Sequence, residues 1–286
     1  MQTIEWRGIK PKLRGQADDY PKPRTNTLPT TISIAPAYSR LENDIVNIDA
    51  AFAAGENILY DVRNTIKKIE LGGHLLAVKS FRPPKWPQSV IYGRWRTSKA
   101  ERSFKNAQAL IASGIPTPQP VAFTQTIHNG RLTRSYYICE YFEHDCSMAP
   151  VLEKAAALEP REDVLAATEI LMRFVDFSYR MHESGILHRD HNTGNTLLRS
   201  VNNEVLFSII DINRMKFGKL SLRARLNNFV RLTDNTDLLK KMAQRYAHVA
   251  DVDPLTCERI LLSKKQSHLR KLALKRRLKK FIRGNR

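Results

Sequence analysis

The 286-residue sequence has few cysteines and lacks any long apolar run. Its three cysteines, Cys139, Cys146 and Cys257, show neither the even count of a disulfide framework nor the paired spacing of a structural metal site. No stretch approaches the roughly 18 consecutive apolar residues of a transmembrane helix, and the N-terminal residues lack the apolar core of a secretory signal. We therefore expect a chain that is soluble or peripheral to a membrane, in a reducing cytoplasmic setting.

Acidic residues are also scarce relative to basic ones. Aspartate and glutamate number 28 against 47 lysines and arginines, which gives a formal net charge of +19. A positive field of this size attracts polyanions, namely nucleic acid, an anionic membrane, or a phosphorylated or carboxylated substrate. The hydrophobic content of 42% is that of an ordinary globular protein with a sizeable core, so the charge indicates partners and not a fold.

Three separated fragments carry candidate chemistry. The central one is H-R-D-x-x-x-x-N, from His188 to Asn195, between a helix-like and a strand-like segment. Lys79 closes one apolar strand-like run, and Asp211 closes another. A strand lysine, this loop and a strand-ending aspartate follow one another in the same order in protein-kinase-like phosphotransferases. Each fragment alone is weak, because a strand-end aspartate often only caps a turn, but their order predicts one site.

The pattern along the chain predicts a two-lobed, protein-kinase-like α+β fold, with a small antiparallel-sheet N-lobe and a mainly helical C-lobe. We expect residues 1–50, where prolines recur among Lys, Arg and Thr, to form an irregular extension. Residues 51–143 should form the N-lobe and residues 144–263 the C-lobe. Residues 264–286 hold eleven Lys and Arg and no acid. They predict a basic helix, either packed on the large lobe or bound to an anionic surface.

Phosphoryl transfer from ATP depends mostly on positioning and charge neutralisation, which suggests a role for each candidate residue. Asp190 would accept or orient the proton of the attacking hydroxyl, and Lys79 would hold the α- and β-phosphates. Asn195 and Asp211 offer the hard oxygen donors that Mg²⁺ prefers, so we predict them as metal ligands. His188 is expected to be a packed scaffold residue rather than a base. The predicted cofactors are therefore ATP and Mg²⁺.

The rest of the nucleotide site departs from the protein-kinase pattern. The glycine-rich G-x-G-x-x-G loop is absent from the first strand–strand turn. Glu101 is the only acid in the helix that should supply a partner for Lys79, but Ser98 three residues earlier makes a capping box that also explains it. Backbone groups near Glu140 and Tyr141, at the end of a later strand, would bind the adenine ring.

Further segments make the resemblance more specific. Tyr92 and the runs 96–104, 114–122 and 211–217 are similar to the lipopolysaccharide kinase family. Its members are kinase-like enzymes of Gram-negative bacteria that phosphorylate inner-core sugars, among them 3-deoxy-D-manno-octulosonic acid (Kdo). The resemblance covers roughly residues 55–245. It implies an ATP- and Mg²⁺-dependent kinase that acts on Kdo or heptose of a lipid-linked core, at the cytoplasmic face of the inner membrane.

On this resemblance Lys79, Asp190, Asn195 and Asp211 carry over as the nucleotide, catalytic and metal positions. The chain has D-x-N where protein kinases have D-F-G, so that Asn213 replaces the glycine. The basic tail would bind the anionic membrane that carries the substrate, and nucleic acid is not an expected partner. Two rivals stay open. One is a kinase-fold enzyme with a protein or small-molecule acceptor, and the other is a catalytically silent kinase-shaped protein that binds membrane or nucleic acid.

Overall fold

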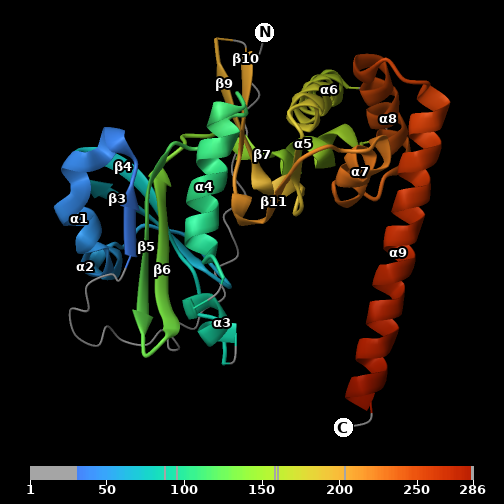
Figure 1. Ribbon diagram of the computed structural model, residues 1–286. Helices are drawn as coiled ribbons and strands as arrows, with labels where there is room; N and C mark the ends of the chain where they lie inside the picture. The colour runs from blue at the N-terminus through green and yellow to red at the C-terminus, as the bar shows by residue number, and fades with distance from the viewer. Residues whose placement is uncertain are drawn as a thin grey trace. The chain divides into compact units, whose positions relative to one another are not determined.

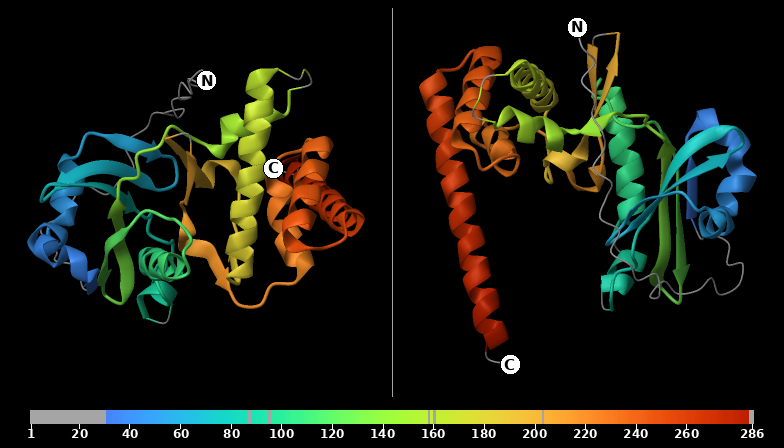
Figure 2. Two further views of the ribbon diagram at one scale, coloured as in Figure 1. Left: turned by 90° about the horizontal axis from the view of Figure 1, so that it is seen from above. Right: turned by 180° about the vertical axis from the view of Figure 1, so that it is seen from behind.

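The computed structural model describes residues 31–86, 88–94, 96–157, 159, 161–202 and 204–284. Their contacts divide into two compact units. The N-terminal unit runs up to Glu143 and also includes Ser208–Arg214. The C-terminal unit comprises His144–Phe207 and the chain from Met215 onward. Figure 1 and Figure 2 show the elements of each.

The N-terminal unit is built on a six-stranded antiparallel sheet with the order β1-β5-β6-β4-β3-β2. Its strands are β1 (Thr31–Ile34), β2 (Ile58–Asp61), β3 (Thr65–Leu71), β4 (His74–Ser80), β5 (Pro120–His128) and β6 (Arg131–Glu140). The β3–β4 hairpin turns at Gly72 and Gly73, whose φ angles are 53° and 78°. A Cβ at Gly72 would displace the Cδ2 methyl of Leu41, and the positive φ angle disfavours any other residue at this turn.

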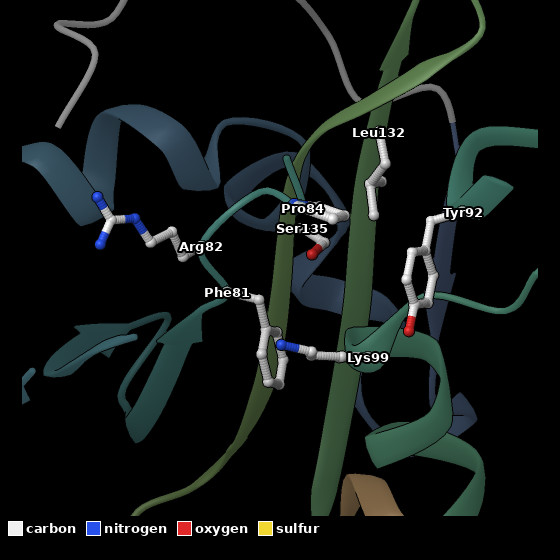
Figure 3. Close-up of a pocket in the computed structure, with 7 residues that line it drawn as sticks. All are labelled: Phe81, Arg82, Pro84, Tyr92, Lys99, Leu132 and Ser135. Atoms are coloured by element: carbon white, nitrogen blue, oxygen red, sulfur yellow. The ribbon is translucent and has the colours of Figure 1, made fainter. Parts of the chain in front are cut away.

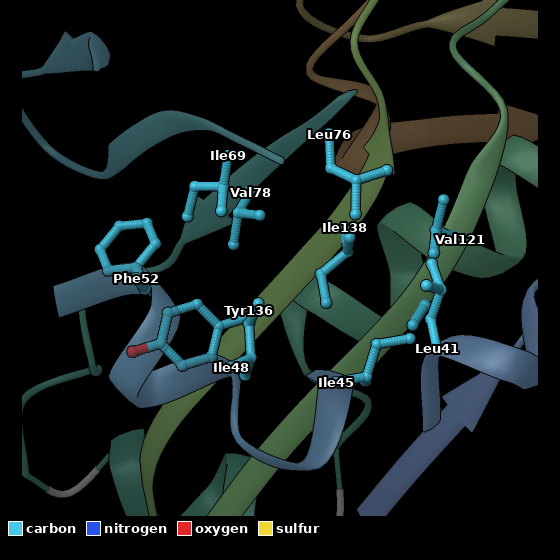
Figure 4. Close-up of a cluster of buried hydrophobic side chains, with 11 residues drawn as sticks. Leu41, Ile45, Ile48, Phe52, Ile69, Leu76, Val78, Val121, Tyr136 and Ile138 are labelled. Carbon is cyan, nitrogen blue, oxygen red and sulfur yellow. The ribbon is translucent and has the colours of Figure 1, made fainter. Parts of the chain in front are cut away.

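Helices pack on both faces of this sheet (Figure 1). They are η1 (Pro36–Leu41), α1 (Glu42–Val46), α2 (Ile48–Ala54), α3 (Gln88–Arg94), α4 (Lys99–Ala112) and η3 (Ile212–Arg214). Figure 4 shows the core between the sheet and α1–α2, where Ile45, Phe52, Val78 and Ile138 are buried together. On α4, Phe104 lies 5.6 Å from Phe123 of β5, measured between ring centroids. Lys79 alternates with Val78 along β4, so it points away from the α1–α2 core.

Residues 31–50 correct our expectation of an irregular extension over residues 1–50. They form β1, η1, α1 and the start of α2, and Ile45 and Ile48 are fully buried. Asp49 accepts hydrogen bonds from Arg134 (2.8 Å) and from the hydroxyl of Tyr136 (2.6 Å), which fixes α2 to β6. Pro36 starts a helix instead of interrupting one, because proline is compatible with the first helical turn. Residues 1–30 lie outside the described residues.

The C-terminal unit is mainly helical. Its elements are β7 (Cys146–Ser147), α5 (Met148–Ala155), α6 (Glu162–Glu183), β8 (Ile186–His188), η2 (Thr193–Asn195), β9 (Thr196–Val201), β10 (Glu204–Ile209), β11 (Met215–Phe217), α7 (Leu222–Asn227), η4 (Asn228–Arg231), α8 (Thr236–Ala250) and α9 (Pro254–Gly284). The last two residues of β10 belong to the N-terminal unit. The small strands form a β10-β9-β7 sheet and a β11-β8 pair. Helices α6 and α8 pack together, and Arg245 binds both carboxylate oxygens of Asp176 at 2.7 and 2.6 Å.

The basic C-terminal segment is the last two-thirds of a longer helix than we expected. Helix α9 begins at Pro254, ten residues before Lys264. Asp253 caps this end, because its carboxylate accepts a hydrogen bond from the backbone N–H of Thr256 (2.8 Å). Its first half packs on α7 and α8 through the buried residues Cys257 and Leu261. No helix in the described part of the chain is long and apolar enough to cross a membrane.

Candidate active site

Lys79 and Asp211 form an ion pair within the N-terminal unit. Lys79 stands in β4, opposite Ile66 of β3 and Tyr137 of β6. Its Nζ lies 2.6 Å from Oδ1 of Asp211. The lysine side chain is 14% exposed and the aspartate side chain 39% exposed, so solvent reaches mainly the carboxylate. The structure therefore brings together two of the fragments that the sequence predicted for one site.

The backbone of Asp211 adopts a conformation that few non-glycine residues adopt. Its φ angle is 55°, in the left-handed region, where Asp and Asn are the side chains tolerated best. The Nδ2 group of Asn213 donates to Asp211 Oδ1 at 2.7 Å. Asn213, which we noted only as a departure from D-F-G, thus orients the carboxylate directly.

Two side chains hold the segment around Asp211 in place. Asn106 of α4 donates to the carbonyl oxygen of Ile212 at 2.7 Å, and Thr117 donates to that of Ile209 at 2.7 Å. The backbone N–H of Ile209 donates in turn to the carbonyl oxygen of Pro116 at 3.0 Å. These bonds stabilise a strained backbone at a position whose carboxylate is a candidate metal ligand. Sequence reasoning missed Asn106, which lies about a hundred residues away from the segment it holds.

Asp190 and Asn195 lie in one tight loop of the C-terminal unit. The Nδ2 groups of Asn192 and Asn195 both donate to the carbonyl oxygen of Asp190, at 3.0 and 2.8 Å. The backbone N–H of Gly194 donates to Asn192 Oδ1 at 2.9 Å. Because Asn195 uses its amide nitrogen inside the loop, its amide oxygen is the atom suited to a cation.

The carboxylate of Asp190 has a partner that the sequence did not suggest. Nη1 of Arg231 lies 3.1 Å from Asp190 Oδ1, and the aspartate side chain is 24% exposed. Arg231 is separated from Asp190 by 41 residues, and no local motif marks it. Arg231 therefore orients the carboxylate of Asp190 through its Oδ1 atom.

The histidines of this loop are packing residues. His188 and His191 are buried, and the ring of His191 stacks on Phe174 with centroids 5.2 Å apart. Burial lowers the pKa of His191 well below its usual value, so this ring is neutral at physiological pH. The Nδ1 atom of His188 accepts the backbone N–H of Asp190 at 3.2 Å, in keeping with the scaffold role predicted for it.

Glu101 contributes its backbone N–H to the cap at Ser98, while its carboxylate pairs with Lys105 and not with Lys79 as expected. Its backbone N–H donates to Ser98 Oγ at 3.1 Å, as the capping box predicts. Its carboxylate lies 2.6 Å from Lys105, one turn further along α4. Within the described part of the chain, Lys79 is paired with Asp211 instead, so the acid on α4 is engaged elsewhere in this conformation.

The strand end proposed for adenine binding is tied into the sheet. The backbone N–H of Glu140 donates to the carbonyl oxygen of Gln119 at 2.9 Å, and that of Tyr141 donates to the carbonyl oxygen of Leu75 at 2.8 Å. The carboxylate of Glu140 accepts the hydroxyl of Tyr38 at 2.8 Å. These two N–H groups are therefore already engaged, and adenine recognition at Glu140 and Tyr141 stays a prediction for other atoms of this strand end.

A small cavity lies in the N-terminal unit, and its lining includes Phe81, whose ring centroid is 5.2 Å from Nζ of Lys79. It has a volume of about 20 Å³, the size of a single water molecule, and is lined by Phe81, Arg82, Pro84, Tyr92, Lys99, Leu132 and Ser135 (Figure 3). Such a volume cannot hold a nucleotide. The cavity nevertheless gathers Tyr92 and Lys99, two residues in the segments that carry the family resemblance.

Comparison with known proteins identifies the family. The model of the lipopolysaccharide kinase (Kdo/WaaP) family matches residues 89–252, which is more than half of the chain. The chain belongs to this family. Members of the family are kinases that transfer a phosphoryl group to a sugar hydroxyl, so the chain is a phosphotransferase, as its motifs predicted. No curated protein sequence matches the chain.

A solved structure described as WaaP in complex with acyl carrier protein shares the fold. It is 16% identical to this chain, covers 85% of this chain and 99% of its own, and superimposes with a TM-score of 0.59. At 16% sequence identity, this structural similarity supports an assignment of the fold alone. It confirms the protein-kinase-like α+β fold, and the family match confirms the resemblance drawn from the sequence.

Proposed function

We propose that this lipopolysaccharide kinase uses ATP and Mg²⁺ to phosphorylate a hydroxyl of an inner-core sugar, Kdo or heptose. The observation that carries the proposal is the Lys79–Asp211 pair, held in a strained backbone and oriented by Asn213. A purely structural ion pair does not require a carboxylate in the left-handed region. Strained backbone at a polar, partly exposed residue is typical of a functional site.

The donor chemistry at the proposed metal positions fits Mg²⁺. Asp211 offers a partly exposed carboxylate and Asn195 an amide oxygen, both hard ligands. The ion, when bound, neutralises charge on the phosphates. Lys79, which now pairs with Asp211, is the cation that would hold phosphate oxygens of the nucleotide. Asp190, paired with Arg231, would orient the sugar hydroxyl and accept its proton.

The acceptor is tested directly with the purified protein. We expect phosphate transfer from Mg²⁺·ATP to a Kdo-containing lipid A acceptor or to its heptose-extended form, with the product identified by mass spectrometry. A parallel incubation with casein and free monosaccharides covers the rival acceptors. Transfer only to casein or to free monosaccharides would show that the acceptor is a protein or a small molecule and not a core sugar. No transfer to any acceptor, together with no stabilisation by Mg²⁺·ATP, would support the catalytically silent rival.

We further propose that α9 holds the enzyme on the anionic, cytoplasmic face of the inner membrane. The buried ammonium of Lys265 donates to Val230 (2.8 Å) and Thr233 (2.7 Å), and it also pairs with Asp234. Beyond Lys265 the described side chains of α9 are largely exposed, with Leu269, Leu272, Leu274 and Leu278 among them. Exposed leucines between cations, with no acid from residue 264 onward, suit an anionic interface.

Neutralising part of this helix is expected to weaken membrane binding. Each cation near an anionic surface contributes about 1 kcal/mol, so replacing Lys275, Arg276 and Arg277 by Gln should reduce binding to phosphatidylglycerol-containing vesicles by roughly two orders of magnitude at low salt. All three side chains are exposed, so the fold should persist. Cosedimentation with vesicles, repeated at high salt and with phosphatidylcholine alone, measures the effect. The control Leu274→Ser/Leu278→Ser should instead reduce the salt-resistant part of binding, and equal binding by all variants would refute the membrane role.

A further inference from the structure

A chain of hydrogen bonds runs through the core of the C-terminal unit and ends at the loop that carries Asp190. Nδ2 of Asn228 lies 2.8 Å from the carbonyl oxygen of His188, and Oδ1 of Asn228 lies 3.0 Å from Nε2 of His182. Nδ1 of His182 lies 3.1 Å from the hydroxyl of Tyr246. The side chains come from η4, α6 and α8, and all of them are buried.

The carbonyl oxygen of His188, at the end of this series of hydrogen bonds, determines which atom donates and which accepts in each bond. A carbonyl oxygen only accepts, so Asn228 must turn its NH₂ group to His188 and its oxygen to His182. That oxygen requires a proton on Nε2 of His182, which leaves Nδ1 to accept the hydroxyl proton of Tyr246. In this arrangement His182 is neutral, with one ring nitrogen donating and the other accepting. Burial lowers the pKa of His182 to about 4, and burial raises the pKa of Tyr246, so both groups stay in the required forms at neutral pH.

The carbonyl oxygen at the end of the chain closes the turn that presents Asp190. The backbone N–H of His191 donates to His188 O at 3.1 Å, which makes a turn from His188 to His191 with Asp190 as its third residue. His188 O thus accepts one bond from the turn itself and one from Asn228. The bond from His191 lies within the turn itself. The bond from Asn228 connects the turn to η4.

We propose that Asn228 is a positioning residue for phosphoryl transfer, which fixes the turn that carries Asp190 and is itself held in one orientation by His182. This inference rests on the proposed role of Asp190 as the group that orients the acceptor hydroxyl. A misplacement of about 1 Å at a reacting group can cost roughly a hundredfold in rate, so an anchor here acts on turnover and not only on stability.

An amide suits this position better than a carboxylate would. A buried carboxylate could not donate to His188 O and would place a second negative charge near Asp190. It would also favour a proton on Nδ1 of His182, which would then donate to the hydroxyl oxygen of Tyr246 and reverse that bond. The neutral chain satisfies every one of these buried polar groups without adding charge beneath the catalytic loop.

The test combines kinetics with hydrogen exchange of the loop. We expect Asn228→Ala to lower kcat by about tenfold to a hundredfold, with the KM for ATP within a few-fold of wild type, because Lys79 and Asp211 are untouched. The amides of Asp190 and His191 should exchange faster with deuterium in this variant, since the turn has lost its anchor. Unchanged exchange, or faster exchange with an unchanged kcat, would overturn the proposal.

A matched pair at His182 covers the case in which Asn228→Ala fails to fold. Glutamine can place its NH₂ group near the Nε2 position of histidine, whereas asparagine reaches only the Nδ1 position. His182→Gln should therefore keep the bond to Asn228 and a kcat within a few-fold of wild type, while His182→Asn should lose both. Equal losses of kcat and equal loop exchange in the two variants would contradict the proposal.

Failure of the proposed function gives a different result. If the wild type transfers no phosphate but Asn228→Ala still accelerates exchange at Asp190 and His191, the kinase assignment fails and the anchor stands. If the wild type transfers phosphate and the loop does not respond to Asn228→Ala, the anchor fails and the kinase assignment stands.

Discussion

An Asp190→Asn variant is expected to bind Mg²⁺·ATP as the wild type does, while its kcat falls by about 10²- to 10⁴-fold. Asparagine keeps the size of the side chain but cannot accept a proton from the sugar hydroxyl. Nucleotide binding should persist, because Lys79 and Asp211 belong to the N-terminal unit and Asp190 to the other. Steady-state phosphate transfer measures the first effect, and thermal shift with Mg²⁺·ATP measures the second.

The control for Asp190→Asn is a change of similar kind outside the proposed site. Arg173→Gln breaks the exposed Arg173–Glu169 pair of α6 (2.6 Å), which lies within one helix and should contribute little to stability. This variant should keep the kcat of the wild type. Normal turnover in Asp190→Asn would show that another group, or water, takes the hydroxyl proton.

The second large effect is expected at Asp211. At a ligand concentration of about 100 times Kd, the wild type should gain about 2.7 kcal/mol of stability from Mg²⁺·ATP. Asp211→Asn should lose most of this increment and most of its activity, because the charge that holds the ion is gone. Asparagine tolerates the φ angle of 55°, so the backbone should persist. Asp211→Ala should in addition lower the stability of the free protein, by roughly 1 kcal/mol or more.

Asp49→Asn separates loss of ligand binding from loss of stability. Asp49 also lies in the N-terminal unit and also pairs with a cation, Arg134 at 2.8 Å. Its replacement should lower the melting temperature and leave the Mg²⁺·ATP increment unchanged. An increment that survives in Asp211→Asn, or that disappears equally in Asp49→Asn, would exclude Asp211 as a specific metal ligand.

Local motifs in the sequence predict the residues of the candidate site, but not the contacts that hold these residues in place. Lys79 and Asp211 each close an apolar strand-like run, and the structure pairs them. The contacts that fix them come from distant parts of the chain, such as Asn106 on α4 and Thr117 before β5. No spacing rule links these residues, since tertiary packing alone decides which carbonyl oxygens they meet. Arg231 and Asn228 escaped prediction for the same reason.

Two predictions depended on competing explanations of one residue or segment. Glu101 had both a capping role and a possible ion pair with Lys79, and the structure shows its backbone N–H bonded to Ser98 and its carboxylate paired with Lys105. The prolines before residue 37 suggested an irregular extension. The apolar residues Ile45, Ile48 and Phe52 outweighed them, because their helical spacing buries them against the sheet. Hydrophobic periodicity was the stronger signal for residues 31–50.

Because Ser208–Arg214 belongs to the N-terminal unit, no single cut in the chain separates the two units completely. This heptapeptide is folded into the N-terminal unit, although the residues on either side of it belong to the other unit. A fragment that stops at residue 143 would leave Asn106 and Thr117 without their carbonyl acceptors and would lack Asp211. The N-terminal unit can therefore be rebuilt only when the missing heptapeptide is supplied, for example by fragment complementation or by a circular permutation. A truncation or nonsense mutation anywhere before residue 214 removes part of both halves at once.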